Sequence, residues 1–221
     1  MKKIVLIVVL MGSFLMAGSK VLYSLDFSKQ KDGDATAWMQ SKGFQFLLDS
    51  KELNLRFSKG RLTFETTNSI AGLFGVRFKD GISNVGSVLI EWGVEKFPKG
   101  ANWSQGNNRV AIGAIFVMGK ERFSSGIPFV KSVPYFLAPF IGEKESVGKQ
   151  YTGKLYKKSG KYYCVSNKTG LKKTRFNIDQ KFKASFGVNV PALTAFAFQM
   201  NTKNTDGGAK AFIKKITIYS K

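Results

Sequence analysis

The chain has 221 residues, of which 35 are Lys or Arg and 14 are Asp or Glu, so its formal net charge is +21 at pH 7. It contains no His, which excludes Ser-His-Asp and Cys-His catalytic arrangements and the usual zinc and copper sites. Its single Cys excludes an intramolecular disulfide, so stability has to come from packing.

Residues 1–19 predict a secretory signal peptide. Lys2 and Lys3 precede an apolar run over 4–16, and Ala17-Gly18-Ser19 provides the small residues that signal peptidase reads. The run is shorter than the roughly 20 apolar residues that span a bilayer, and no Cys follows it to carry a lipid. A buried N-terminal strand or an uncleaved anchor is the alternative. We therefore expect 20–221 to form the mature protein, with no transmembrane segment, in the periplasm or outside the cell.

Alternation of apolar and polar residues predicts strands along most of the remaining chain. The segments are 21–27, 44–48, 52–57, 61–66, 73–78, 88–95, 110–118, 161–166, 194–200 and 209–219. In the last one, the apolar positions change phase across Lys214-Lys215, which predicts a β-bulge. Segment 124–140, with three Pro among aromatic residues, predicts a long loop over one end of the fold.

One short helix is expected near 177–186, where Asn177 can cap its first turn and Gly187 can end it.

Cys164 lies in an apolar strand-like run and is predicted to be a buried, inert thiol, since no His is present to activate it. The strand spacing and the Gly, Asn, Asp and Lys turns predict an all-β protein: a single antiparallel β-sandwich of the jelly-roll type over 20–221.

A series of motifs then appears in a fixed order: Lys161-Tyr-Tyr-Cys-Val165, Asn177-Ile-Asp179, Asn201-Thr-Lys-Asn-Thr205 and Gly207-Gly-Ala-Lys-Ala-Phe-Ile213. With Ile90-Glu-Trp92 in the first half, this order resembles a bacterial exported family, catalogued as a domain of unknown function, number 3047. The family's C-terminal element reads Asp-Thr-Asp-Asn-Thr, and both of its acids are replaced here, by Asn201 and Lys203. The resemblance therefore implies neither an activity nor a metal site for this chain.

A polar loop around Trp103 is the first candidate binding site. An aromatic ring in a Gly- and Asn-rich loop can stack on the apolar face of a sugar, and Asn102, Gln105 and Asn107 can supply hydrogen bonds. In the alternative interpretation, Trp103 folds back as a lid on the core.

The second candidate is the basic segment 149–183, which has ten Lys, one Arg and a single acid. Lys157, Lys158, Lys172 and Lys173 are predicted to bind an anionic partner, such as an acidic polysaccharide or an envelope surface. Tyr residues alternate with these Lys along the segment, which fits binding of an anionic glycan but equally fits a strand with Tyr inward and Lys outward. A Lys-rich surface that is only solvated, with no ligand, is a further alternative. Nucleic acid is not an expected partner, because only six basic residues are Arg.

No catalytic residue, cofactor or metal site is predicted. Glu91 and Glu95 share a strand face about 13 Å apart, farther than the roughly 5 to 9.5 Å between paired glycosidase carboxylates. Loop 201–208 has one carboxylate and a Lys, which favours a turn held by Asx hydrogen bonds over a calcium site.

The sequence thus favours an exported β-sandwich that binds an anionic glycan or envelope component. The alternatives are a polysaccharide-degrading enzyme that uses Tyr, Lys and carboxylates, and a structural factor of the envelope.

Overall fold

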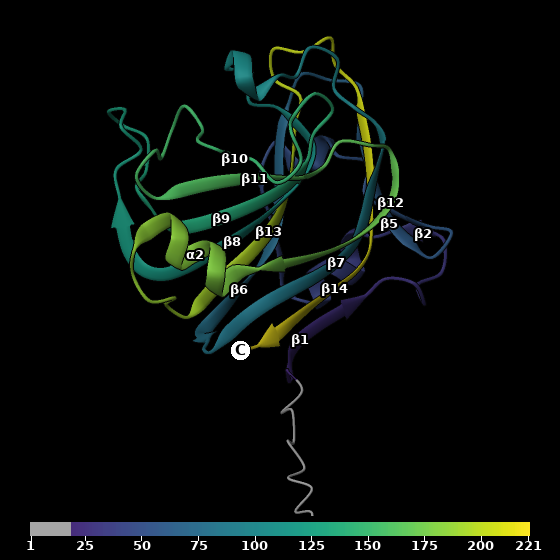
Figure 1. Cartoon of the computed structure of the whole chain (residues 1–221). Coiled ribbons are helices and arrows are strands. Elements are labelled where there is room, and N and C mark those ends of the chain that lie inside the picture. The colour runs from purple at the N-terminus through teal and green to yellow at the C-terminus, as the bar shows by residue number, and fades with distance from the viewer. Residues whose placement is uncertain (1–18) are drawn as a thin grey trace, which may run out of the picture.

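The computed structural model describes residues 19–221 and shows two seven-stranded β-sheets packed against each other (Figure 1). The predicted signal peptide lies, except for Ser19, outside the described residues. Sheet A has the order β12 (Gly170–Asn177), β7 (Val85–Lys96), β14 (Ala209–Ser220), β5 (Arg61–Thr66), β4 (Arg56–Ser58) and β2 (Gly33–Asp34), with β1 (Val21–Asp26) also paired to β14. Sheet B has the order β10 (Gln150–Tyr151), β11 (Gly160–Ser166), β9 (Val133–Ile141), β8 (Val110–Phe123), β13 (Leu193–Asn201), β6 (Ala71–Ile82) and β3 (Phe44–Leu48).

The predicted antiparallel β-sandwich is confirmed, with one departure. Every strand pair is antiparallel except β9 and β11, which are parallel. Parallel neighbours need a crossover rather than a tight turn, and the connection over 142–159 supplies it. The sequence pattern identified β11 but neither β9 nor this pairing.

The core lies between the sheets and is built mainly by alternating apolar residues. Along β7 the side chains of Val88, Ile90, Trp92 and Val94 are fully buried, and those between them face outward. The buried Trp92 donates its indole N–H to the Thr174 hydroxyl at 3.0 Å, which satisfies the polar group that the ring brings into the core.

The predicted β-bulge in β14 is confirmed. The register of β14 against β7 shifts between Ile213 and Lys215, so Ile213 and Ile216 both reach the core although three positions separate them. Lys214 and Lys215 consequently both lie half-buried at the outer surface of sheet A.

Helix α2 (Ile178–Phe186) has the predicted ends. The side chain of Asn177 accepts a hydrogen bond from Gln180 N at 2.9 Å, and Gly187 ends the helix with φ 70°. The structure adds a second helix, α1 (Thr36–Ser41), and the short 3-10 turns η1 (Ser50–Glu52) and η2 (Trp103–Gln105). The expectation of one helix was wrong because six residues are too few to show a helical repeat. Within 19–221, neither helix has the length and apolar character to span a bilayer.

The expectation of a loop over 124–140 was wrong for its second half. Residues 133–141 form β9 in the middle of sheet B, with Pro134 and Pro139 inside it. Proline cannot donate to the strand ladder and is uncommon in central strands. The complete burial of Leu137 and Ile141 against the core outweighs that loss.

Candidate functional site

Trp103 does not offer a stacking surface to a ligand. Its side chain is 7% exposed, with the Phe140 ring stacked at 4.8 Å and the Tyr162 ring at 4.6 Å. Its indole N–H donates to the carbonyl of Arg109 at 3.1 Å. Trp103 is instead a lid folded back on apolar residues, which was the alternative interpretation. Its ring belongs to a second apolar cluster on the outer side of sheet B.

The other predicted residues of this loop mostly hold the loop itself. The Asn102 side chain accepts from Gln105 N at 3.2 Å. Asn107 Nδ2 donates to the carbonyls of Gly100 and Asn204 at 2.8 and 3.1 Å. Only the Gln105 side chain is exposed and has no described partner. The Asn residues that the sequence marked as ligand contacts are therefore occupied by turn formation.

The four predicted lysines do not converge. Lys157 and Lys158 are exposed in the turn before β11 in sheet B, whereas Lys172 and Lys173 lie on β12 in sheet A. Even within β12 the two alternate, because neighbouring residues of a strand point to opposite faces. Lys172 pairs in register with the inward-facing Trp92 and Lys173 with the outward-facing Glu91. A single ligand on one face of β12 can contact Lys173 but not Lys172.

The tyrosines and the thiol of the same region are structural. Tyr151 and Tyr163 are 8% and 4% exposed, and they pack in different apolar clusters on the two sides of sheet B. Cys164 is fully buried, and burial raises the pKa of its thiol, as expected of an inert Cys.

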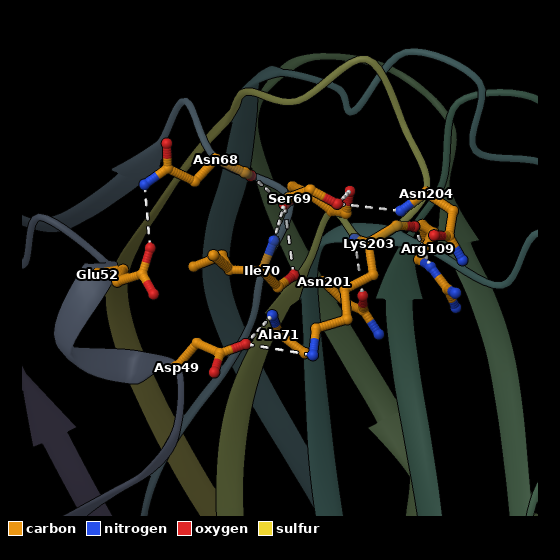
Figure 2. Close-up of polar contacts among 11 residues, drawn as sticks. Asp49, Glu52, Asn68, Ser69, Ile70, Ala71, Arg109, Asn201, Lys203 and Asn204 are labelled. Carbon is orange, nitrogen blue, oxygen red and sulfur yellow. Dashed lines mark hydrogen bonds and ion pairs between the residues drawn. The ribbon is translucent and has the colours of Figure 1, made fainter.

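A polar network closes the end of the sandwich where loop 201–208 passes from sheet B to sheet A (Figure 2). The predicted Asx turn is present, since Asn201 Oδ1 accepts from Lys203 N at 3.2 Å. The Lys203 ammonium lies 3.4 Å from Asp49 Oδ2, which also accepts from Ala71 N at 2.9 Å. These contacts lower the pKa of the Asp49 carboxyl, the Ala71 N–H more than the Lys203 charge.

The hydrogen bonds of this network hold neighbouring loops together and do not form a metal site. Thr202 Oγ1 accepts from Ile70 N at 3.0 Å, and Asn204 N donates to Ser69 Oγ at 3.1 Å. Within 19–221 no group of three His, Cys, Asp or Glu side chains lies close enough to hold a metal ion.

The outer face of sheet A carries the best candidate site, a shallow depression of about 300 Å³. Four strands build it: β12, β7, β14 and β1, which lie side by side in that order. The lining residues all occupy outward-facing positions; they are Val21, Ser24, Leu89, Glu91, Lys173, Lys215, Thr217 and Tyr219.

Strand register arranges most of these residues, together with the neighbouring Arg175 and Asp26, in two rows across the four strands. One row runs Arg175, Leu89, Thr217 and Ser24, and the next runs Lys173, Glu91, Lys215 and Asp26. The first row combines an aliphatic side chain with two hydroxyls, whose oxygens lie 3.2 Å apart. The second row alternates positive and negative charge. The depression is thus amphipathic, with apolar, hydroxyl and charged groups within one small area.

The charges in the depression are only partly neutralised. Lys215 Nζ lies 3.3 Å from Asp26 Oδ2, and Lys214 Nζ lies 4.0 Å from Glu91 Oε2. Lys173 and Arg175 have no acidic partner among residues 19–221. Arg175 instead donates to Ser87 Oγ at 3.0 Å and places its guanidinium 4.8 Å from the Tyr219 ring. The β12 side of the depression therefore presents two unpaired cations next to an aromatic ring.

The Asp26 carboxyl next to the depression is unsuited to act as a general acid. A general acid needs a raised pKa to stay protonated near neutral pH. The pKa of Asp26 is instead lowered, by the Ser28 hydroxyl first and by its own ion pair with Lys215 as well.

Sequence reasoning missed Tyr219, Arg175 and Lys215 as members of one site. The signal was present in part, because the alternation in 88–95 and 209–219 assigned Leu89, Glu91, Thr217 and Tyr219 to outward faces. What was missing was strand β12, which the pattern did not identify, and the order in which β1 and β12 flank the pair formed by β7 and β14.

Comparisons with known proteins were made for the whole chain. No protein-family model matches it, and no curated protein sequence does. A family 29 carbohydrate-binding module from Piromyces equi aligns over 90% of this chain and 89% of its own, with 10% identity and a TM-score of 0.37. TmCBM61, solved with β-1,4-galactotriose, aligns over 89% and 99%, with 7% identity and a TM-score of 0.39. The carbohydrate recognition domain of Emp46p, in its potassium-bound form, aligns over 89% and 96%, with 12% identity and a TM-score of 0.41.

Proposed function

We propose that this protein is an exported β-sandwich that binds an anionic glycan in the depression on the outer face of sheet A. The observation that carries the proposal is the pair of unpaired cations, Lys173 and Arg175, beside the partly exposed Tyr219 ring and the hydroxyls of Ser24 and Thr217. Export rests on the predicted signal peptide.

The chemistry of the depression matches that of an acidic sugar. A sugar ring has an apolar face, which can pack on Leu89 and Tyr219, and a rim of hydroxyls, which can bond to the exposed Ser24 hydroxyl. A carboxylate or sulfate on that ring would be held by Lys173 and Arg175, and Arg provides the bidentate geometry that such groups accept.

The size of the depression indicates how the glycan lies. A volume of about 300 Å³ is at the small end of ligand sites, which reach roughly 1,000 Å³. We therefore expect it to hold one or two rings of a chain that continues across the open sheet.

The test is titration with acidic and neutral oligosaccharides at two salt concentrations. We expect acidic chains to bind more tightly, and K173Q/R175Q to remove that preference and most of the salt dependence, because exposed charges are screened within about 8 Å at physiological ionic strength. Y219A should weaken binding at both salt concentrations. K172Q is the matched control, since it changes a Lys on the same strand but the opposite face, and should leave binding unchanged.

The possible outcomes separate the functions. Equal binding of acidic and neutral chains, or equal loss in K172Q and K173Q/R175Q, would contradict the proposed site. Absence of any glycan binding would favour a structural role in the envelope. Release of reducing or unsaturated sugar ends during the incubation would favour the enzyme alternative.

A further inference from the structure

The loop between β8 and β9, residues 124–132, carries a protruding apolar tip. Phe129 has 107% relative exposure, and Ile127 and Val130 have 51% and 38%. Among the large hydrophobic side chains of residues 19–221, Phe129 is the most exposed. Isolated exposed apolar residues are ordinary on protein surfaces, whereas three within four positions at the end of one loop mark a candidate interaction site.

Hydrogen bonds within the loop hold the tip together. Ser125 is 3% exposed, and its hydroxyl accepts from Ile127 N at 3.1 Å and lies 2.9 and 3.3 Å from the carbonyls of Ile127 and Val130. This buried hydroxyl thus joins both ends of the tip. Phe129 has φ 63°, a left-handed conformation that is unfavourable for a bulky residue. The loop therefore presents the aromatic ring to solvent at some conformational cost.

Basic residues surround the base of this tip. The neighbouring turn before β11 is fastened to it, because Tyr156 N donates to Ser125 O and Tyr156 Oη donates to Lys131 O, both at 3.0 Å. Lys157 and Lys158 follow directly and are exposed. The nearest acid along the loop is Glu121, on its stem, and neither 122–142 nor 146–178 contains an Asp or Glu. The apolar tip is thus flanked by uncompensated positive charge.

We propose that this loop is a membrane-docking device that inserts Phe129, Ile127 and Val130 into the interface of an anionic phospholipid bilayer. Lys131, Lys157 and Lys158 would bind the lipid headgroups. Charge complementarity selects the partner, because exposed apolar side chains next to Lys clusters match the layered polarity of an anionic membrane surface. The shape agrees, since a protruding ring needs a complementary pocket on a protein but none in a fluid bilayer.

The experiment is cosedimentation of the purified protein with vesicles. On phosphatidylcholine containing about one third phosphatidylglycerol, we expect F129S to weaken binding about tenfold and K157Q/K158Q to weaken it about tenfold or more. Pure phosphatidylcholine should bind weakly. L48S is the matched control, because Leu48 is 70% exposed on β3, an edge strand of sheet B away from the tip, and should bind as the wild type does. All four changed positions are exposed, so the variants should fold.

Insertion itself has a direct readout. The F129W variant should show a blue shift of its fluorescence and quenching by brominated lipid on anionic vesicles. The wild type should change little, because Trp92 and Trp103 are buried and the half-buried Trp38 lies on α1, outside the tip. Y219A should keep full vesicle binding, which separates this proposal from the glycan site.

Three results would overturn the proposal. The first is equal vesicle binding by F129S and the wild type, which would reduce the interaction to surface charge. The second is equal loss of binding in L48S and F129S. The third is self-association of the wild type that F129S abolishes, which would assign the tip to a protein contact.

Discussion

Replacing Trp103 by Ala tests whether this residue is a lid or a ligand contact. The Trp103 ring is packed against Phe140 and Tyr162 and is 7% exposed. Truncation of such a buried aromatic costs about 3–5 kcal/mol of unfolding free energy. For a domain of this size, each kcal/mol lowers Tm by about 2–4 °C, so we expect W103A to melt roughly 6–20 °C below the wild type.

The assay combines thermal unfolding, followed by circular dichroism, with glycan titration well below the transition. W103A should bind acidic oligosaccharide within about twofold of the wild type, because Trp103 lies on the outer side of sheet B and the proposed site lies on sheet A. W103F is the control: it keeps a packed ring but leaves the Arg109 carbonyl without its donor, at a cost of about 1 kcal/mol. An unchanged Tm together with lost affinity would refute this reasoning and restore Trp103 as a ligand contact.

Three further substitutions test local features of the fold. T174V removes the acceptor of the Trp92 indole N–H and should cost about 1–3 kcal/mol in urea unfolding, whereas T174S should not. N177A removes the cap of α2 and should cost about 0.5–2 kcal/mol, and an unchanged midpoint would contradict that role. The pKa of Asp26 is lowered in the folded state, chiefly by Ser28, so the stability that this carboxylate contributes is present above its unfolded pKa and is lost as pH falls through its folded pKa. Unfolding measured from about pH 5 to about pH 2 should therefore show a smaller loss for D26N than for the wild type, and equal losses would argue against the linkage.

The elements best predicted from sequence are those determined by residues close together in the chain. The strands at 44–48 and 61–66 have the predicted ends, and so do the cap and the end of α2. The bulge at Lys214-Lys215 was also predicted, because a change of phase within one strand is a local property. The prediction failed over 133–141, where two prolines concealed a strand that only its place between β8 and β11 stabilises.

The candidate site was predicted far less completely. Lys173 was named from sequence and lies in the depression, but Lys172 was named with it and faces the other way. Trp103, Asn102 and Asn107 are engaged in holding their own loop in place, and composition alone cannot distinguish such a loop from a binding loop. Whether a polar side chain is free or occupied depends on partners elsewhere in the chain, such as the Asn204 carbonyl that Asn107 contacts.

By itself, the sequence determined the fold class, the phase of the strands with clear alternation, such as β7 and β14, and the excess of positive charge. These follow from residue types and their spacing over a few positions. Only the tertiary structure decided which strands are neighbours, and hence that Lys173, Glu91, Lys215 and Asp26 form one row across sheet A. The reason is physical: alternation specifies which side chains of a strand are buried, but the choice of partner strand depends on hydrogen bonds and core contacts between segments far apart in the chain.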